Sequence, residues 1–252
     1  MRILLTNDDG IHAHGLKVLE RIARQLSDDI WIVAPEKDQS GVGRSITMND
    51  PMRLREVSSK KFALTGTPTD CVIAGVKEIM DAPPDLILSG VNSGQNICDY
   101  VTYSGTVAGA MEGAILGIKS IALSQTYTFH NGEKDILWDT AEQHGVGVIQ
   151  KLIEQDFPDR SLVNVNFPNC KSEEVVGSAL TNQGINPHVL GMREQKDGRG
   201  LPYYWLSFSK EDDILLPGSD VLALRENKIS ITPLKVDKTD KDFYNSLNAV
   251  FS

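Results

Sequence analysis

The chain has 252 residues, 40% of them hydrophobic, which is enough to bury the core of one large domain. Its formal net charge of −9 argues against a nucleic-acid polymer as the main partner, because a polyanion requires a basic surface. Cys71, Cys98 and Cys170 are odd in number and follow no disulfide or zinc-binding pattern, so we expect reduced thiols in a cytoplasmic protein.

The first predicted element is a buried strand over residues 2–6, which are mostly apolar. Asn7-Asp8-Asp9-Gly10 follows it and precedes an amphipathic helix. The apolar face of that helix carries Leu16, Leu19, Ile22, Ala23 and Leu26. Polar residues interrupt the first strand too soon for a signal peptide, and no later stretch is long enough to cross a bilayer. We therefore expect no membrane partner.

Asp8 and Asp9 come directly after the first strand, where an open α/β sheet binds its ligands. Two adjacent carboxylates repel each other and are costly to desolvate without a counter-charge. A hard divalent cation removes that repulsion and prefers oxygen ligands. The alternative is an ordinary polar turn, in which Asp tolerates unusual backbone angles and Gly10 supplies a positive φ.

Strand and helix patterns alternate through the rest of the first half. Strand patterns lie at residues 30–34, 62–64, 85–92 and 120–124. Helix patterns lie at residues 71–79, after a run of cap-type residues at 66–70, and at residues 104–117. This alternation predicts an α/β fold with a mainly parallel sheet covered by helices on both faces.

The second half is less regular. A helix is predicted from about Asp135 to Ile153, followed by a strand at 162–166. Residues 182–218 are rich in Gly, Pro and charge and predict a hairpin or arm rather than a second core. A strand at 229–232 leads to a short C-terminal helix, where Thr239 and Asp242 have the spacing of a capping box. Phe243, Leu247 and Val250 share one face of that helix.

Oxygen-bearing residues follow several of the predicted strands. Besides Asp8 and Asp9, these are Ser40, in the loop after the second strand, and Asn92. The carboxyl ends of parallel strands meet at one edge of a sheet, so the four would form an all-oxygen donor set. Such a set suits magnesium or manganese and not zinc or copper. Ser40 taken alone is most simply a loop serine.

The segment Ser104-Gly105-Thr106 opens a predicted helix with little side-chain bulk. Its exposed backbone N–H groups and the helix dipole favour a bound phosphate. Gly105, Gly109 and Gly113 recur four residues apart and predict a smooth stripe that lets the helix approach the sheet closely. The alternative is that Ser104 is only an N-cap and the glycines serve only packing.

Six motifs occur in order through the first half of the chain. They are Asn7-Asp8-Asp9-Gly10-Ile11, Ala34-Pro35 with Ser40-Gly41, Gly66-Thr67-Pro68-Thr69-Asp70-Cys71, Ser89-Gly90-Val91-Asn92 with Gly94 and Asn96, Tyr103-Ser104-Gly105-Thr106-Val107, and Met111-Glu112-Gly113. Together with Ile231-Thr232-Pro233-Leu234 and Val236-Asp237 near the end, they resemble the survival protein E (SurE) family of metal-dependent 5′/3′-nucleotidases. The resemblance covers essentially the whole chain.

The resemblance implies a Rossmann-like, three-layer αβα fold in a single domain over residues 1–252. Within it, residues 1–125 would form the core with the active site, and residues 182–218 a projecting β-hairpin arm. Residues 229–252 would supply a C-terminal strand and helix that is exchanged between subunits, building a homodimer or homotetramer.

The resemblance also implies a phosphomonoesterase acting on nucleoside monophosphates, with some members acting on short polyphosphate. One divalent cation per subunit, Mg²⁺ or Mn²⁺, would be held by Asp8, Asp9, Ser40 and Asn92. Asn96 and the Ser104-Gly105-Thr106 turn would hold the phosphate, with Asp8, Asp9 and Asn96 catalytic. A bound water would attack phosphorus, or Asp8 or Asp9 would act as a covalent nucleophile.

One departure from the family pattern lies beside the site: Ala13-His14-Gly15 stands where the family commonly has Ala-Pro-Gly. His12 and His14 could serve as general acids there or be simply solvated. Two rival functions keep the same scaffold. One is a non-catalytic nucleotide- or metal-binding regulator, although the chain lacks G-x-G-x-x-G after the first strand. The other is an interaction protein whose arm and tail matter most.

Overall fold

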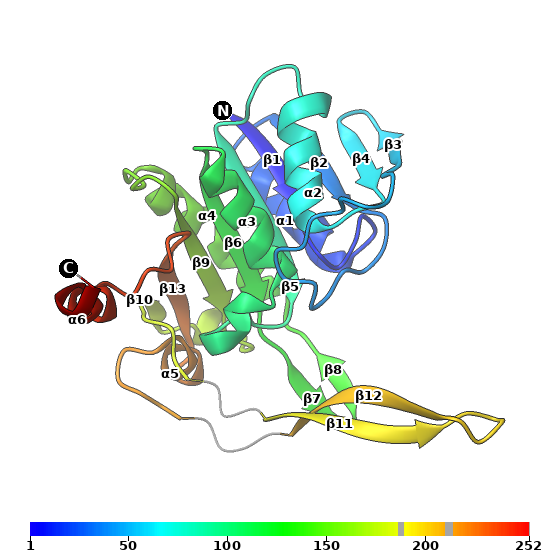
Figure 1. Cartoon of the computed structure of the whole chain (residues 1–252). Coiled ribbons are helices and arrows are strands. Elements are labelled where there is room, and N and C mark those ends of the chain that lie inside the picture. The colour runs from blue at the N-terminus through cyan, green and yellow to red at the C-terminus, as the bar shows by residue number, and fades with distance from the viewer. Residues whose placement is uncertain (186–188, 210–213, 252) are drawn as a thin grey trace.

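A computed structural model describes residues 1–185, 189–209 and 214–251. Over these residues the chain forms one nine-stranded sheet and two separate two-stranded hairpins (Figure 1). In spatial order the sheet contains β10 (Gly177–Leu180), β13 (Lys228–Lys235), β9 (Ser161–Phe167), β6 (Lys119–Gln125), β5 (Leu86–Ser93), β1 (Arg2–Thr6), β2 (Asp29–Pro35), β4 (Lys61–Leu64) and β3 (Leu54–Ser58).

The six strands from β9 through β4 pair in parallel, and antiparallel pairing occurs where β13 joins β9 and where β3 joins β4. The mainly parallel sheet expected from the sequence is therefore confirmed. β1 lies between β2 and β5. The chain builds outward through β2 and β4 on one side, then returns to build β5, β6 and β9 on the other. This reversal places a ligand-binding crevice at the carboxyl ends of β1 and β5.

Helices cover both faces of the sheet. On one face, α1 (His14–Arg24) and α4 (Asp139–Ile153) pack into the largest apolar cluster, with residues such as Leu19 and Ile149. On the other face, α2 (Pro68–Ala74) contributes Val72 to one smaller cluster and α3 (Gly105–Ile115) contributes Val107 to another. The helices that cover the sheet are labelled in Figure 1.

The glycine stripe of α3 lies directly on the sheet, as the sequence predicts. A Cβ on Gly113 would lie 2.2 Å from Ser120 Oγ, and one on Gly109 would lie 3.0 Å from Ser89 Oγ. A side chain at position 113 would clash with the sheet, and one at position 109 would push its neighbours away, so the glycines let α3 pack at this distance. The close packing fixes the N-terminal end of α3 above the carboxyl ends of the central strands.

Several elements differ from the sequence-based expectations. The helix expected from Asp135 begins at Asp139, because Glu133–Asp135 forms β8, which pairs with β7 (Thr128–His130). The helix expected over residues 71–79 is formed by α2 and the π-helical turn η1 (Gly75–Ile79) that continues it. The short elements β3, β10, α5 (Asp220–Arg225), η2 (Cys98–Thr102) and η3 (Ser172–Glu174) had no clear sequence signal. The capping box expected for the last helix is wrong. Thr239 donates instead to Asp237 Oδ1, and Asp240 Oδ1 caps Phe243 N.

The predicted arm contains a hairpin of β11 (Val189–Lys196) and β12 (Pro202–Ser209), which extends away from the sheet in Figure 1. Residues 186–188 and 210–213 of the arm lie outside the described residues. The last helix, α6 (Lys241–Phe251), lies away from the sheet in Figure 1 and exposes Phe243 and Tyr244. Among the described helices, none is both long and apolar enough to cross a membrane.

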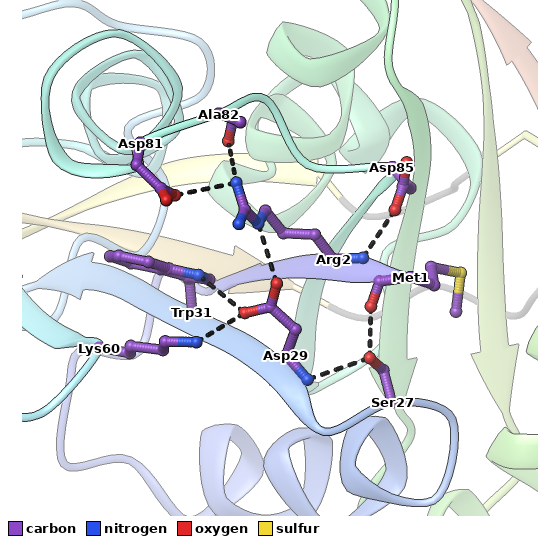
Figure 2. Close-up of polar contacts among 9 residues, drawn as sticks. All are labelled: Met1, Arg2, Ser27, Asp29, Trp31, Lys60, Asp81, Ala82 and Asp85. Carbon is purple, nitrogen blue, oxygen red and sulfur yellow. Dashed lines mark hydrogen bonds and ion pairs between the residues drawn. The ribbon is translucent and has the colours of Figure 1, made fainter.

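A cluster of compensated charges fixes the amino ends of β1 and β2 (Figure 2). Asp29 accepts hydrogen bonds from Arg2 Nε (2.9 Å) and Lys60 Nζ (2.7 Å), and Arg2 also pairs with Asp81 (2.9 Å). The hydrogen bonds from Lys60 and Arg2 lower the pKa of Asp29 to about 2. The charges at the amino ends of these strands are therefore compensated, in contrast to the carboxylates at the carboxyl ends.

Candidate active site

Asp8 lies at the carboxyl end of β1, beneath the N-terminus of α3. It is only 4% exposed, and its Oδ1 accepts a hydrogen bond from Thr106 Oγ1 (2.5 Å). A Cβ on Gly105 would lie 2.8 Å from Asp8 Cβ, so only glycine allows the helix to start this close to the carboxylate. Asp8 and Thr106 are 98 residues apart in the sequence. The acidic pair, Asp8 and Asp9, and the Ser104-Gly105-Thr106 turn therefore form one site.

Asp9 is half-buried and faces the end of β5. The backbone N–H of Ser93 donates to Asp9 Oδ2 (3.1 Å), which brings the neighbouring Asn92 to the acidic pair. Asn92 Nδ2 donates to the carbonyl of Gly94 (2.8 Å), which occupies its amide nitrogen within its own turn. The amide oxygen of Asn92 is then the atom available as a ligand donor.

The loop after β2 joins the site through its backbone. Gln39 N–H donates to the carbonyl oxygen of Asp8 (2.8 Å), and Ser40 follows directly. Ser40 is exposed, and both its N–H (2.8 Å) and its hydroxyl (2.6 Å) donate to Asp38 Oδ1. Because the Ser40 hydroxyl acts as the donor, its oxygen keeps its lone pairs for another group. Asp38 also adds a further negative charge near Asp8 and Asp9.

The two carboxylates of the pair are poorly compensated. Burial raises the pKa of Asp8 from 3.8 to about 6, and the charge of Asp9 adds to this effect, while the Thr106 hydrogen bond opposes it. Burial also raises the pKa of Asp9, and the charge of Asp38 contributes, whereas Lys134 and the Ser93 N–H oppose the rise. Among the described residues, no ion pair within 4 Å neutralises either carboxylate. The site therefore favours a bound cation.

The donor set fits a hard cation. No group of three or more His, Cys, Asp or Glu side chains that could hold a metal ion occurs within the described residues. A cation here would therefore use the oxygens of Ser40 and Asn92 besides the two carboxylates. Nearby, Asn7 Oδ1 is buried and has no hydrogen-bond partner among the described residues, which adds an oxygen dipole at the same strand end.

The N-terminus of α3 has the expected cap. Ser104 Oγ accepts a hydrogen bond from Val107 N (3.0 Å), and Ser104 is buried. The cap uses the Val107 N–H, and the Thr106 N–H interacts with the Asp8 carboxylate, so among the described contacts the Gly105 N–H is the first-turn donor that is left for an anion. Because Gly105 adjoins Asp8, an anion at this helix start would lie next to a cation bound at the acidic pair.

Asn96 lies in a different environment from the other proposed site residues. It is 7% exposed, and its Nδ2 donates to Ser124 Oγ (2.8 Å). The side chain of Asn166 binds the backbone of Asn96. Its Oδ1 accepts a hydrogen bond from Asn96 N (2.8 Å), and its Nδ2 donates to Asn96 O (3.1 Å). Among the described contacts, none joins Asn96 to Asp8 or Asp9. The structure thus anchors Asn96 to β6 and β9.

The two histidines near the site do not reach the carboxylates through any contact within the described residues. His14 packs against the ring of Trp138, with ring centroids 5.3 Å apart. His12 is exposed. Asp38 and Lys134, which sequence reasoning missed, influence Asp9 more directly. The Asp-x-Ser spacing of Asp38 and Ser40, typical of an Asx turn, could have revealed Asp38. No local signal in the sequence marks Lys134.

Comparisons with known proteins find similar sequences and a similar solved structure. The family model described as survival protein SurE matches residues 3–189. The protein named 5′-nucleotidase SurE from Brucella anthropi is 56% identical over 239 residues, covering 95% of this chain and 93% of that protein. The one from Mesorhizobium japonicum is 56% identical over 248 residues, covering 98% of each. The crystal structure of the SurE protein from Aquifex aeolicus covers 100% of both chains with a TM-score of 0.84 and 35% identity.

Proposed function

Because the chain belongs to the SurE family, we propose that it hydrolyses the phosphate ester of nucleoside 5′-monophosphates to a nucleoside and phosphate. It is a nucleotide phosphomonoesterase of the 5′-nucleotidase class. The observation that carries this proposal is the contact of Asp8 with Thr106 and Gly105, which joins a cation-seeking carboxylate to an anion-binding helix start. A non-catalytic regulator is not favoured by the relatives' names.

Asp8, Asp9, Ser40 and Asn92 would hold one Mg²⁺ or Mn²⁺ per subunit. A cation held there would supply polarisation of the phosphoryl group and a lowered pKa for a water molecule. The unneutralised carboxylates and the free oxygens of Ser40 and Asn92 support this assignment. Thr106 keeps Asp8 in a fixed orientation through its hydroxyl, which donates to Oδ1, while Oδ2 lies 3.0 Å from the position that a Cβ on Gly105 would occupy.

The first turn of α3 would bind the phosphate of the substrate. The backbone N–H group of Gly105, in the Ser104-Gly105-Thr106 turn, would donate to a phosphoryl oxygen, and the helix dipole would stabilise the charge that develops during transfer. Ser104 shapes this turn as its cap. Asn96, which is bound by Ser124 and Asn166, would act on the phosphate through its remaining side-chain oxygen or through the adjacent loop.

We propose that water, rather than a carboxylate, attacks phosphorus, because both aspartates are assigned to the cation. Rapid acid quench with ³²P-labelled nucleotide would test this assignment, since an aspartyl intermediate would retain label on the protein. Label recovered on Asp8 or Asp9 would overturn the water mechanism without changing the class of reaction.

The deciding experiment is phosphate release from a panel of 5′- and 3′-nucleoside monophosphates and short polyphosphate, with Mn²⁺, with Mg²⁺ and with EDTA. We expect release from 5′-nucleotides that depends on the cation and is abolished in the Asp9→Asn variant. Lack of release from folded protein under all metal conditions would refute the proposed activity. Metal-independent release would refute the cation assignment alone.

We also propose that the chain forms a homodimer or homotetramer in the cytoplasm. Exposed aromatic residues on α6 and on the arm, Phe243, Tyr244, Tyr204 and Trp205, support the assembly. The three cysteines are buried and unpaired, as suits a reducing compartment. Light scattering of full-length protein, compared with a Phe243→Ser variant, would test the assembly, and a monomeric wild-type protein would contradict it.

A further inference from the structure

The β7–β8 hairpin, residues 128–135, lies beside the carboxylate site rather than apart from it. It follows β6 directly, and the backbone at the end of β6 binds the turn after β5, with Gly94 N donating to Gln125 O (2.9 Å). The ring of Tyr127 packs against that turn. A Cβ on Gly94 would lie 3.1 Å from Tyr127 Cε1, so the missing side chain gives the ring its place. Gly94 is two residues from Asn92, a proposed cation ligand.

Asn169 fixes the hairpin to the body of the protein. Its Nδ2 donates to Thr128 Oγ1 (3.1 Å) on one strand and to the carbonyl of Asp135 (3.0 Å) on the other. Its Oδ1 accepts a hydrogen bond from Leu137 N (2.8 Å). One side chain from the loop after β9 therefore holds both ends of the hairpin and the start of the segment that leads to α4.

Lys134 extends from this hairpin toward the site. Its ammonium lies 4.5 Å from the centroid of the Tyr127 ring and 3.4 Å from the carbonyl oxygen of Ser93. Ser93 is the residue whose N–H donates to Asp9. Within the described residues Lys134 makes no ion pair with a carboxylate. Its ammonium contacts the face of the Tyr127 ring and makes one long hydrogen bond to Ser93, so it keeps N–H donors for another group.

Resting on the proposed function, we propose that Lys134 binds the phosphate of the substrate, with Tyr127 as the positioning residue that holds its ammonium toward Asp9. A nucleoside monophosphate is a dianion, whereas this protein carries a net charge of −9 and the charge of Asp38 adds to those of the carboxylates of Asp8 and Asp9. A divalent cation offsets two of those carboxylates. Lys134 adds the further positive charge needed to attract and hold the dianion.

The test compares the wild-type protein with Lys134→Met and Lys134→Arg variants at low ionic strength. In Lys134→Met we expect the KM for a 5′-nucleoside monophosphate to rise about tenfold and kcat to change less than about threefold. Calorimetry with inorganic phosphate and Mn²⁺ should show about tenfold weaker phosphate binding. Mn²⁺ affinity should be unchanged or higher, because a repelling cation is lost. Lys134→Arg should restore most of both phosphate readouts.

Lys151→Met is the matched control, because it removes the same charge from an exposed position on α4, far along the helix from the site. Tyr127→Phe should retain phosphate affinity, whereas Tyr127→Leu should lose part of it, since the ring face positions the ammonium. Unfolding midpoints would check that each variant is folded.

The outcomes separate this inference from the proposed function. If the wild-type protein releases phosphate and Lys134→Met matches Lys151→Met in KM and phosphate affinity, only the role of Lys134 is overturned. A weaker Mn²⁺ affinity in Lys134→Met would also overturn it, because it would mean that the lysine supports the cation site. If the wild-type protein releases no phosphate, the proposed function fails, and the calorimetric comparison still decides the role of Lys134.

Discussion

Replacing Asp8 with Asn should make the metal-free protein more stable while abolishing its activity. The carboxylate of Asp8 is nearly fully buried, and its pKa is raised from 3.8 to about 6 by burial and by Asp9. At about 1.36 kcal/mol per pKa unit, the ionised carboxylate costs the folded, metal-free protein about 3 kcal/mol. An asparagine has the same shape and still accepts the Thr106 hydrogen bond, but it carries no charge.

The sign of the pH dependence follows from the raised pKa. A folded state that holds its proton more tightly than the unfolded chain loses stability as pH rises from about 4 to about 6. The wild-type protein therefore carries the full cost at pH 8 and almost none below pH 4. The advantage of Asp8→Asn should be largest at pH 8 and should decrease as the pH falls through 6.

The assay is thermal unfolding of both proteins in EDTA at pH 8 and pH 5, repeated with Mn²⁺. For a protein of this size, each kcal/mol corresponds to about 2–4 °C, so we expect Asp8→Asn to melt several degrees higher in EDTA at pH 8. Added Mn²⁺ should stabilise the wild-type protein and not the variant. A variant no more stable than wild type in EDTA at pH 8 would falsify the electrostatic reasoning.

Three further substitutions test the geometry. Gly105→Ala should lower kcat/KM by at least about tenfold with little loss of secondary structure, because its Cβ would lie 2.8 Å from that of Asp8 and push α3 away; unchanged kinetics would contradict the contact. Gly15→Ala should destabilise the fold by about 3 kcal/mol in urea unfolding, since its Cβ would lie 1.8 Å from the carbonyl oxygen of Val91. Asp29→Asn should lower the melting temperature at pH 7, and the difference in melting temperature between wild type and variant should narrow as the pH falls toward 2. The pKa of Asp29 is lowered to about 2, so its charge stabilises the fold above that pH and is lost below it. A difference that stays constant with pH would show that the hydrogen bonds, and not the charge, matter.

The features that sequence alone predicts are those encoded in local patterns. The glycine stripe of α3 repeats every four residues, so the face that touches the sheet can be identified without any tertiary information. The meeting of Asp8 with Thr106 is consistent with the general property of open α/β sheets that ligand-binding groups gather at the carboxyl ends of the strands, where Asp8 follows β1 and Thr106 lies in the first turn of α3. Strong local signals of this kind account for the central strands and the four covering helices.

The features that sequence does not predict depend on long-range contacts between weakly patterned segments. The β7–β8 hairpin has two strands of three residues whose side chains are all exposed, so no alternation marks them. Its position depends on Asn169, which lies more than 30 residues away in the chain. The anchoring of Asn96 likewise requires Asn166, which only the pairing of β6 with β9 places beneath it.

Aspartates at the two ends of the parallel strands lie in opposite electrostatic environments. At the amino ends of the strands, Arg2 and Lys60 compensate Asp29, so its charge stabilises the fold (Figure 2). At the carboxyl ends, Asp8 and Asp9 are buried or half-buried without an ion pair among the described residues, so their charges destabilise the metal-free fold. Fold stability alone would favour an uncharged residue at position 8. A carboxylate that is held there against its electrostatic cost, by a threonine hydroxyl and a glycine contact, is therefore best explained by a cation that removes the cost when it binds.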